Sequence, residues 1–336
     1  MGRRRGTPWT GRQSIAGQHR PIYSTLEKIQ QDGPLCPEET APEEQRLCFH
    51  GQAAETEPWL CLLQHPWLQP RGDQREAAGL SWRLRRSAEA RLWYRCADHQ
   101  QPDSHERFLC MMVDLKERVS QLENWSEGKG LIVHGAAETF CSGSDLNAVR
   151  AISNPQDGMK MCMFMQDALT RLLRLPLISV ALVEGRALGG GAELTTACDF
   201  RLMTSGSVIQ FVHKHMGLVP GWGGAARLVR IVGSQKALKL LGGALKVDPE
   251  LGLDIGLADE VLEADQGAAT ALQQAENWLS RYTKGPVPVI HAVKKVVLAG
   301  RELPLSEALR TEKEVFGTVW GAPANLQALA SKSKHK

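Results

Sequence analysis

The spacing of hydrophobic and polar residues changes near residue 110. From Val113 onward, apolar residues recur at helical spacing or form short unbroken runs. Residues 1–109 sustain neither a period of 2.0 residues nor one of 3.6 residues. The sequence therefore predicts an ordered domain over 110–336. It leaves 1–109 unassigned, as a poorly ordered or atypical N-terminal extension.

The ordered part alternates between helices and strands. Buried strands are predicted over 130–134, 177–183, 200–203 and 208–212. The run 177–183 is continuously apolar, which is typical of a parallel sheet covered on both faces. Helices are predicted over 113–122, 159–175, 227–232, 235–241, 268–282, 290–298 and 305–316. This order predicts an α/β fold, with a core at 110–262 and a helical region at 263–336.

Charge and cysteine content narrow the classes of function. A net charge of +3 on 336 residues favours neither a nucleic-acid partner nor a membrane surface. The eight cysteines form no C-x-x-C pair and no zinc-type spacing, so we expect free thiols in a reducing compartment and no metal site. No run of eighteen apolar residues occurs, so no membrane-spanning helix is predicted.

The N-terminal part has a composition of its own. Residues 1–109 contain fourteen Arg and one Lys, whereas 110–336 contain eleven Arg and fourteen Lys. Five arginines precede the first acid, Glu27, as in a mitochondrial presequence, so a mitochondrial location stays open beside the cytosol. Proline and glutamate over 34–58 favour disorder, while four tryptophans leave open a small region that uses them in apolar contacts: Trp59, Trp67, Trp82 and Trp93.

Two strand exits carry the candidate chemistry. The predicted strand at 130–134 leads into a loop that contains Gly143, Ser144 and Asp145, and the strand at 177–183 leads into Gly189-Gly-Gly191. Glycines let a ligand approach backbone N–H groups, and two such loops at the carboxyl ends of buried strands can converge on one oxygen. Each loop alone also fits an ordinary tight turn or a helix N-cap.

Three motifs in order make the sequence resemble the enoyl-CoA hydratase/isomerase (crotonase) family over about 111–336. They are Gly135-x4-Phe-Cys-Ser-Gly-Ser-Asp-Leu146, Ala187-Leu-Gly-Gly-Gly-Ala-Glu-Leu194 and Gly217-Leu-Val-Pro-Gly-Trp-Gly-Gly224. The resemblance implies a crotonase-type spiral of ββα units with a helical C-terminal region. Crotonases begin with further strands and an Asn-Ala loop that packs on CoA, and 1–109 contain no such pattern. The first strands are therefore expected to be missing.

The resemblance also implies roles for particular residues. The backbone N–H groups of Ser144 and Gly190 would form an oxyanion hole for the thioester oxygen of an acyl-CoA. Glu193 stands at the first catalytic glutamate of hydratases, and His215 stands where the family tends to have its second acid. Glu193 could donate a proton to the α carbon if burial kept it neutral, or could be a helix-turn acid. His215 could equally be a surface residue.

Further residues would contact the substrate by the same resemblance. The loop residues are Gly143, Asp145, Leu146 and Gly189. Trp222 would line the pocket or pack as an ordinary core residue, and Lys294 and Lys295 would meet CoA phosphates or form a solvated helix face. The family implies a homotrimer or hexamer built through the helices at 263–336, with acyl-CoA as the partner and no resident cofactor.

Three functions stay open from the sequence. Segments such as Leu122–Gly130 and Phe211–Lys214 resemble the branch of the family that decarboxylates ethylmalonyl-CoA, and less so methylmalonyl-CoA, as cytosolic metabolite proofreading. Hydration or thioester hydrolysis is the second hypothesis, supported by Glu193 and opposed by the missing second glutamate. A truncated, non-catalytic binding protein is the third.

Overall fold

The described residues all lie within Pro42–Lys336. The computed structural model describes residues 59–62, 104–135, 139–144, 149–150, 152, 154–263 and 269–331, and for 59–62 and 104–110 it describes the backbone alone. The N-terminal extension therefore lies almost wholly outside the described residues, as do Asp145 and Leu146.

A five-stranded sheet organises the described fold, with its strands in the order β1-β2-β3-β5-β8. The strands are β1 (Trp59–Leu62), β2 (Gly130–His134), β3 (Ile178–Val183), β5 (Phe200–Thr204) and β8 (Glu260–Leu262), and every neighbouring pair is parallel. A smaller sheet joins β4 (Arg186–Leu188) in parallel to β6 (Val208–Gln210), which pairs antiparallel with β7 (Lys246–Val247). Parallel pairing requires the helical crossovers that the alternating pattern predicts.

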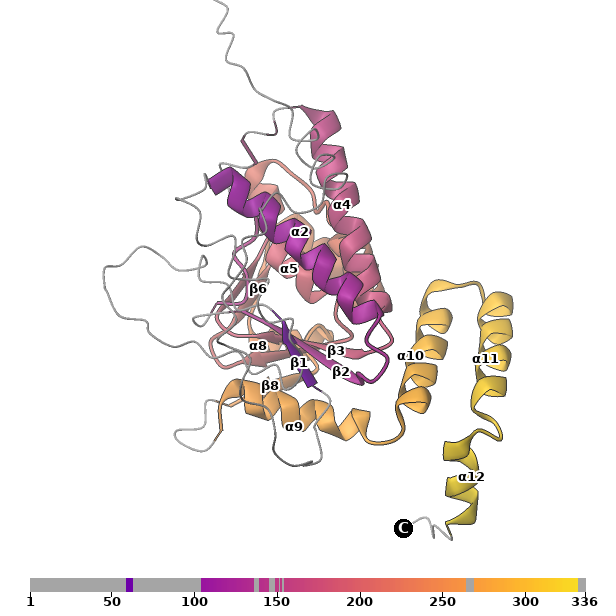
Figure 1. Ribbon diagram of the computed structural model, residues 1–336. Helices are drawn as coiled ribbons and strands as arrows, with labels where there is room; N and C mark the ends of the chain where they lie inside the picture. The colour runs from indigo at the N-terminus through magenta and orange to yellow at the C-terminus, as the bar shows by residue number, and fades with distance from the viewer. Residues whose placement is uncertain are drawn as a thin grey trace, which may run out of the picture. The chain divides into compact units, whose positions relative to one another are not determined.

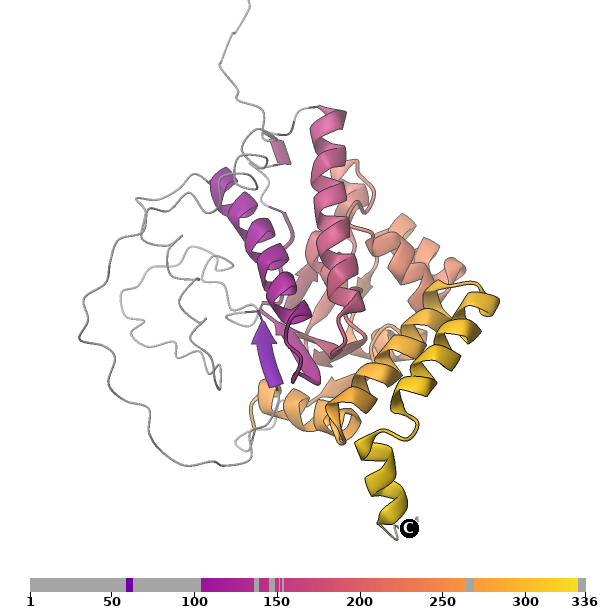
Figure 2. The same cartoon turned by 45° about the vertical axis from the view of Figure 1, so that its right-hand side comes forward.

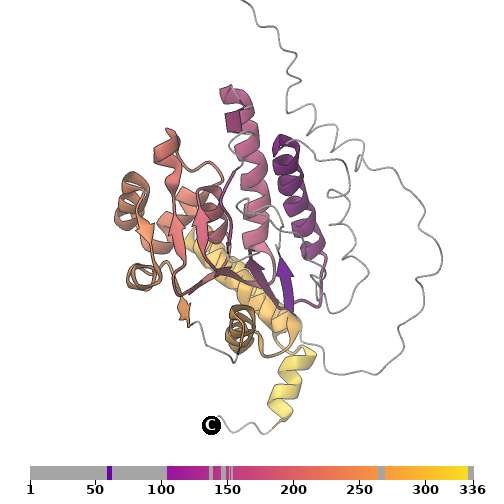
Figure 3. The same ribbon diagram turned by 90° about the vertical axis from the view of Figure 1, so that its left-hand side faces the viewer.

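Helices cover both faces of the larger sheet (Figure 1). On one face, α2 (Ser104–Glu123) and α4 (Pro155–Arg174) pack against Leu131, Val133 and Ala181. On the other face, α9 (Ala271–Thr283) packs against Ile132 and Leu182 (Figure 3). Neighbouring residues of one strand thus enter different layers, because side chains alternate across a strand. Fully burying one such side chain contributes about 1.5–3 kcal/mol.

Local sequence signals fix where the covering helices begin. Asn154 accepts a hydrogen bond from the N–H of Asp157 at the start of α4, and Pro155 occupies the first helical position. Thr270 and Gln273 form a capping box at the start of α9. These caps satisfy backbone N–H groups that the first helical turn leaves without partners.

Further short elements follow β6 and carry the site. They are the 3-10 helix η4 (Val212–Met216), α6 (Gly224–Val232), α7 (Ser234–Gly243) and α8 (Pro249–Ile255), together with α5 (Gly190–Thr195), which comes earlier and follows β4. At the C-terminus, α10 (Val287–Glu302), α11 (Leu305–Val319) and α12 (Pro323–Ala330) follow α9 (Figure 2). Among the described residues, no helix is both long and apolar enough to cross a lipid bilayer.

The helices and strands predicted over 113–316 are confirmed, with most boundaries shifted by four residues or fewer. There are two exceptions: α2 begins at Ser104, well before the predicted start at 113, and the chain leaves the strand after Gln210 and enters η4. The prediction that the sheet starts at β2 needs correction. Backbone of the unassigned N-terminal part forms β1, which pairs with β2 from Trp59 opposite Gly130 to Leu62 opposite Val133. That edge of β2 is therefore paired.

Candidate active site

The two glycine-rich strand exits lie against each other. Cys141 forms an isolated parallel bridge with Ala187, in which the Cys141 N–H donates to the Arg186 carbonyl at 3.0 Å and the Leu188 N–H donates to the Cys141 carbonyl at 2.9 Å. A Cβ atom on Gly191 would lie 2.1 Å from the Cys141 carbonyl oxygen. Main chain therefore packs on main chain here, and only glycine leaves the room for it.

This contact brings Gly143 to the backbone of Gly190. A Cβ atom on Gly143 would lie 3.3 Å from Gly190 N and 2.8 Å from the Leu188 carbonyl oxygen. Gly143 has a φ of +90° and Gly189 a φ of +53°, in the region that favours glycine. Within the described part of the chain, the N–H groups of Ser144 and Gly190 donate to no protein acceptor. The two donors named from the sequence thus lie on adjoining segments.

Glu193 lies on α5 behind these loops and is almost fully buried, with 1% of its surface exposed. Its Oε2 accepts hydrogen bonds from the N–H groups of Trp222 and Gly224, both at 2.8 Å. Its Oε1 lies 3.0 Å from Nε2 of His213. Both carboxylate oxygens are therefore engaged, and the side chain fixes the turn between Trp222 and Gly224.

The same turn is held from two other elements. Gln166 of α4 donates to the Gly221 carbonyl at 2.7 Å. Arg227 of α6 donates to the Trp222 carbonyl at 3.0 Å and to the Thr196 hydroxyl at 3.0 Å. Burial lowers the pKa of Arg227 to about 10, against the opposing effect of Glu193. Trp222 is buried, and a Cβ on Gly190 would lie 2.4 Å from its ring, so the indole covers Gly190.

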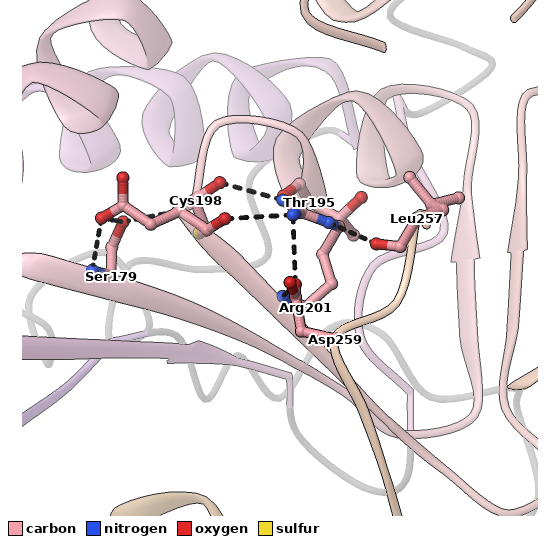
Figure 4. Close-up of polar contacts among 7 residues, drawn as sticks. Ser179, Thr195, Cys198, Arg201, Leu257 and Asp259 are labelled. Carbon is pink, nitrogen blue, oxygen red and sulfur yellow. Dashed lines mark hydrogen bonds and ion pairs between the residues drawn. The ribbon is translucent and has the colours of Figure 1, made fainter. Parts of the chain in front are cut away.

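Arg201 holds α5 from its C-terminal end (Figure 4). Its buried guanidinium donates to the carbonyl of Thr195, the last residue of α5, at 3.5 Å and to that of Cys198 at 3.0 Å. It also donates to the Leu257 carbonyl at 2.5 Å and lies 3.2 Å from the Asp259 carboxylate. A cation is favourable at helical carbonyls, which carry partial negative charge. The contact fixes the end of α5 and, through it, the position of Gly190 and Glu193.

The predicted histidine and lysines occupy different surroundings. His215 has an exposed side chain on η4, whereas His213, to which the sequence motifs gave no role, reaches Glu193. Lys294 is 5% exposed and its Nζ contacts both carboxylate oxygens of Asp199, so its role as a phosphate ligand stays a prediction that this burial does not favour. Lys295 is exposed on α10, and its role stays a prediction.

The thiols near the site are poor nucleophiles. Cys141, Cys162 and Cys198 are free, as the sequence predicts. Burial raises the pKa of each thiol, to about 12 for Cys198, and the charge of Glu193 adds to the effect on Cys162. A protonated thiol attacks weakly, so these groups do not support covalent catalysis. The described residues contain no group of three or more His, Cys, Asp or Glu that could hold a metal ion.

A parallel sheet that delivers two glycine loops to one place defines a fold shared with a known family. Residues 108–325 match the model of the family described as enoyl-CoA hydratase/isomerase. The chain belongs to this family. Among solved structures, an enoyl-CoA hydratase from Bacillus anthracis superposes with a TM-score of 0.61 at 24% identity, covering 67% of this chain and 88% of that one.

Curated relatives are much more similar in sequence. The ethylmalonyl-CoA decarboxylase of Danio rerio is 73% identical over 227 residues, which cover 68% of this chain and 75% of that protein. The ethylmalonyl-CoA decarboxylase of Gallus gallus is 70% identical over 224 residues, covering 67% and 75%. That of Rattus norvegicus is 64% identical over 225 residues, with the same two coverages of 67% and 75%.

Proposed function

We propose that this chain decarboxylates ethylmalonyl-CoA to butyryl-CoA, and methylmalonyl-CoA to propionyl-CoA less well. The observation that carries the proposal is the 60–73% identity, over about two thirds of the chain, to relatives named ethylmalonyl-CoA decarboxylase. The chemistry would correct by-products of carboxylation, and we place it in the cytosol, with the arginine-rich N-terminus as the argument for a mitochondrial alternative.

The proposed reaction breaks the bond between the α carbon and the carboxylate. Its electron pair moves into the thioester to form an enolate, CO2 leaves, and the α carbon then takes one proton from solvent water, which leaves hydroxide. The N–H groups of Ser144 and Gly190 are the proposed donors to the enolate oxygen, supported by the approach of Gly143 to Gly190 N. Removing one such donor typically costs about 2.7–4 kcal/mol of transition-state stabilisation. These donors supply the stabilisation without a resident cofactor.

Glu193 is better suited to holding the turn between Trp222 and Gly224 than to donating a proton to the substrate. Backbone N–H groups can only donate, so Oε2 must accept from both Trp222 and Gly224. Hydration would require a second carboxylate to position water beside Glu193. The side chain on Glu193 within the described residues is His213 instead. This neighbour favours decarboxylation over the hydratase hypothesis.

The remaining assignments describe how the substrate would be held. Gly143, Gly189 and Trp222 surround the proposed donors, and exposed Lys295 is proposed to meet a CoA phosphate. Asp145 and Leu146 keep their proposed place beside Ser144. His215 stays a candidate that its exposed position does not favour. We also propose a homotrimer or hexamer, formed through the exposed apolar side chains of α11 and α12.

Two substitutions of Ser144 test the proposed oxyanion hole. Ser144→Pro removes the backbone N–H, and Ser144→Ala keeps it. With purified full-length protein and ethylmalonyl-CoA, mass spectrometry should show butyryl-CoA formation that falls about 10²–10³-fold in kcat for the proline variant. The alanine variant should retain most of the activity.

Melting temperatures of the three proteins exclude a folding defect as the cause. Folded wild-type protein that releases no CO2 from ethylmalonyl-CoA contradicts the proposed function. Equal activity of the proline and alanine variants contradicts the role of the Ser144 N–H.

A further inference from the structure

His213 is the side chain that the structure places on the carboxylate of Glu193. Its Nε2 lies 3.0 Å from Oε1, and 13% of its side chain is exposed. Its Nδ1 is buried and has no hydrogen-bond partner among the described residues. Among the described residues, the imidazole thus makes a single hydrogen bond, and its partner is the buried carboxylate of Glu193.

The hydrogen-bond pattern favours a proton on Nε2 of His213 over one on Oε1 of Glu193. Oε2 of Glu193 receives two backbone N–H groups, which have no lone pair to accept a proton in return. Only the contact between Oε1 and Nε2 can be made in either direction. A proton on Nε2 leaves the carboxylate as acceptor of all three hydrogen bonds, and hydrogen bonds to an ionised acceptor are stronger than neutral ones.

The charged and titratable groups packed around Glu193 do not replace this contact. Arg227, from α6, donates to the backbone carbonyl of Glu193 at 3.3 Å and not to its carboxylate. Cys162, from α4, interacts with Glu193 through charge and is itself a weak donor. In the described part of the chain, His213 is therefore the one side chain that hydrogen-bonds the carboxylate.

The contacts continue from Glu193 to the proposed oxyanion hole. Glu193 holds the Trp222 N–H, and the Trp222 indole covers Gly190. From the other side, a Cβ on Gly189 would lie 3.4 Å from a methyl group of Val212, the residue before His213. A shift of His213 would therefore reach Gly190 through Glu193 and the Trp222 indole.

We propose that His213 is a positioning residue, whose Nε2–H orients Glu193 and thereby holds the Trp222 turn over Gly190. The inference rests on the proposed function for its effect on turnover. It assigns the working histidine of η4 to position 213 and leaves His215, whose side chain is exposed, without a part in the site.

Two substitutions of His213 separate its hydrogen bond from its volume. Glutamine places an amide nitrogen the same number of bonds from the backbone as Nε2, whereas leucine fills similar space without a donor. With ethylmalonyl-CoA, His213→Leu should lower kcat about ten- to a hundredfold, the effect of losing a hydrogen bond to a charged group. KM should change less than about threefold, because the N–H of Gly190 acts on charge that develops in the transition state. His213→Gln should restore kcat to within about threefold of wild type.

Amide hydrogen exchange tests the same contact without turnover. Exchange at Trp222 and Gly224 should accelerate in His213→Leu and not in His213→Gln, while the amides of β3 stay protected in both variants. If the wild type leaves ethylmalonyl-CoA intact, the proposed function fails, and the exchange at these two amides alone decides the role of His213.

Two results overturn the proposal. One is a His213→Leu variant of an active enzyme with kcat within threefold of wild type or, for an inactive one, with unchanged exchange at Trp222 and Gly224. The other is a His215→Leu variant that loses kcat while His213→Leu keeps it.

Discussion

At the scale of single residues, the site depends on positions that lack a side chain. Gly190 lies under the Trp222 indole, and Gly191 lies against the carbonyl oxygen of Cys141. The two neighbours differ in how far they can yield. An indole can shift within its packing, whereas the Cys141 carbonyl belongs to a main chain already tied to Arg186 and Leu188.

Gly191→Ala should therefore be more damaging than one added methyl group suggests. The new Cβ would lie 2.1 Å from backbone, so the two loops must move apart. Overpacking of this kind typically costs about 1–3 kcal/mol. We expect a lower midpoint in urea unfolding together with a large loss of decarboxylase activity.

Gly206→Ala is the matched control, because no atom lies within 4 Å of a Cβ at that exposed turn. Its φ of +79° alone should cost some stability, without loss of turnover. A Gly191→Ala enzyme with full activity would show that the loops tolerate separation.

The choice between His213 and His215 shows what sequence patterns leave open at this scale. The strand predicted over 208–212 ends before both histidines, so the sequence pattern does not orient either side chain. The chain enters a 3-10 helix at Val212, where successive residues turn by about 120° and residues two apart diverge. Glu193 was found from its motif, but its partner depends on this local change of conformation.

At the scale of elements, length and periodicity decided what could be predicted. The strands β2 and β3 and the helix α4 were identified because each carries its own apolar run or caps. The strands β4, β7 and β8 have two or three residues each, and pairing with chain distant in sequence defines them. The local pattern of apolar and polar residues therefore does not predict these strands. The contact between the two glycine loops was predicted only because parallel strands end at one edge.

The helix α2 contains an acid whose surroundings oppose its charge. Burial, and secondarily the charge of Glu117, raise the pKa of Asp114 from 3.8 to about 6, while Arg118 works against the shift. Between about pH 4 and pH 6, the folded chain thus binds a proton that the unfolded chain has lost. Stability falls as pH rises through this window and stays lowered above it.

Asp114→Asn should remove that penalty. Its melting temperature should exceed that of wild type at pH 7.5, the difference should be small at pH 4, and it should vanish below the ordinary pKa of 3.8, where the wild-type carboxyl is protonated in both states. Thermal melts across this range measure the difference. An advantage of the same size at pH 4 would mean that the gain comes from something other than ionisation.

At the scale of the whole described unit, α10 is attached to the rest of the fold, and α11, which follows it, carries exposed apolar side chains. His291 of α10 contacts the Gly128 carbonyl at 2.6 Å, Glu302 pairs with Arg174 at 2.9 Å, and Lys294 pairs with Asp199. Along α11, Leu305, Leu309 and Phe316 stay exposed at helical spacing, with 56% of Phe316 accessible. Large exposed apolar surfaces of this kind mark sites of protein contact.

Charge on that surface should dissociate the proposed oligomer. We expect wild-type protein to elute as a trimer or hexamer in light-scattering chromatography, and Phe316→Glu as a monomer with intact secondary structure. Lys313→Glu, on the same helix and also exposed, is the control for charge alone and should elute as wild type. A monomeric wild type would contradict the proposed assembly.

The pairing of β1 with β2 has a consequence for how this chain tolerates its unusual upstream sequence. An edge position in a parallel sheet is filled by main-chain amides and carbonyls, over four residues here. Such a demand is indifferent to side-chain identity, so segments without common ancestry can satisfy it. A crotonase core with an unrelated segment upstream therefore need not expose an unpaired edge strand that could associate with other chains, provided that a few extended residues of that segment pair with β2.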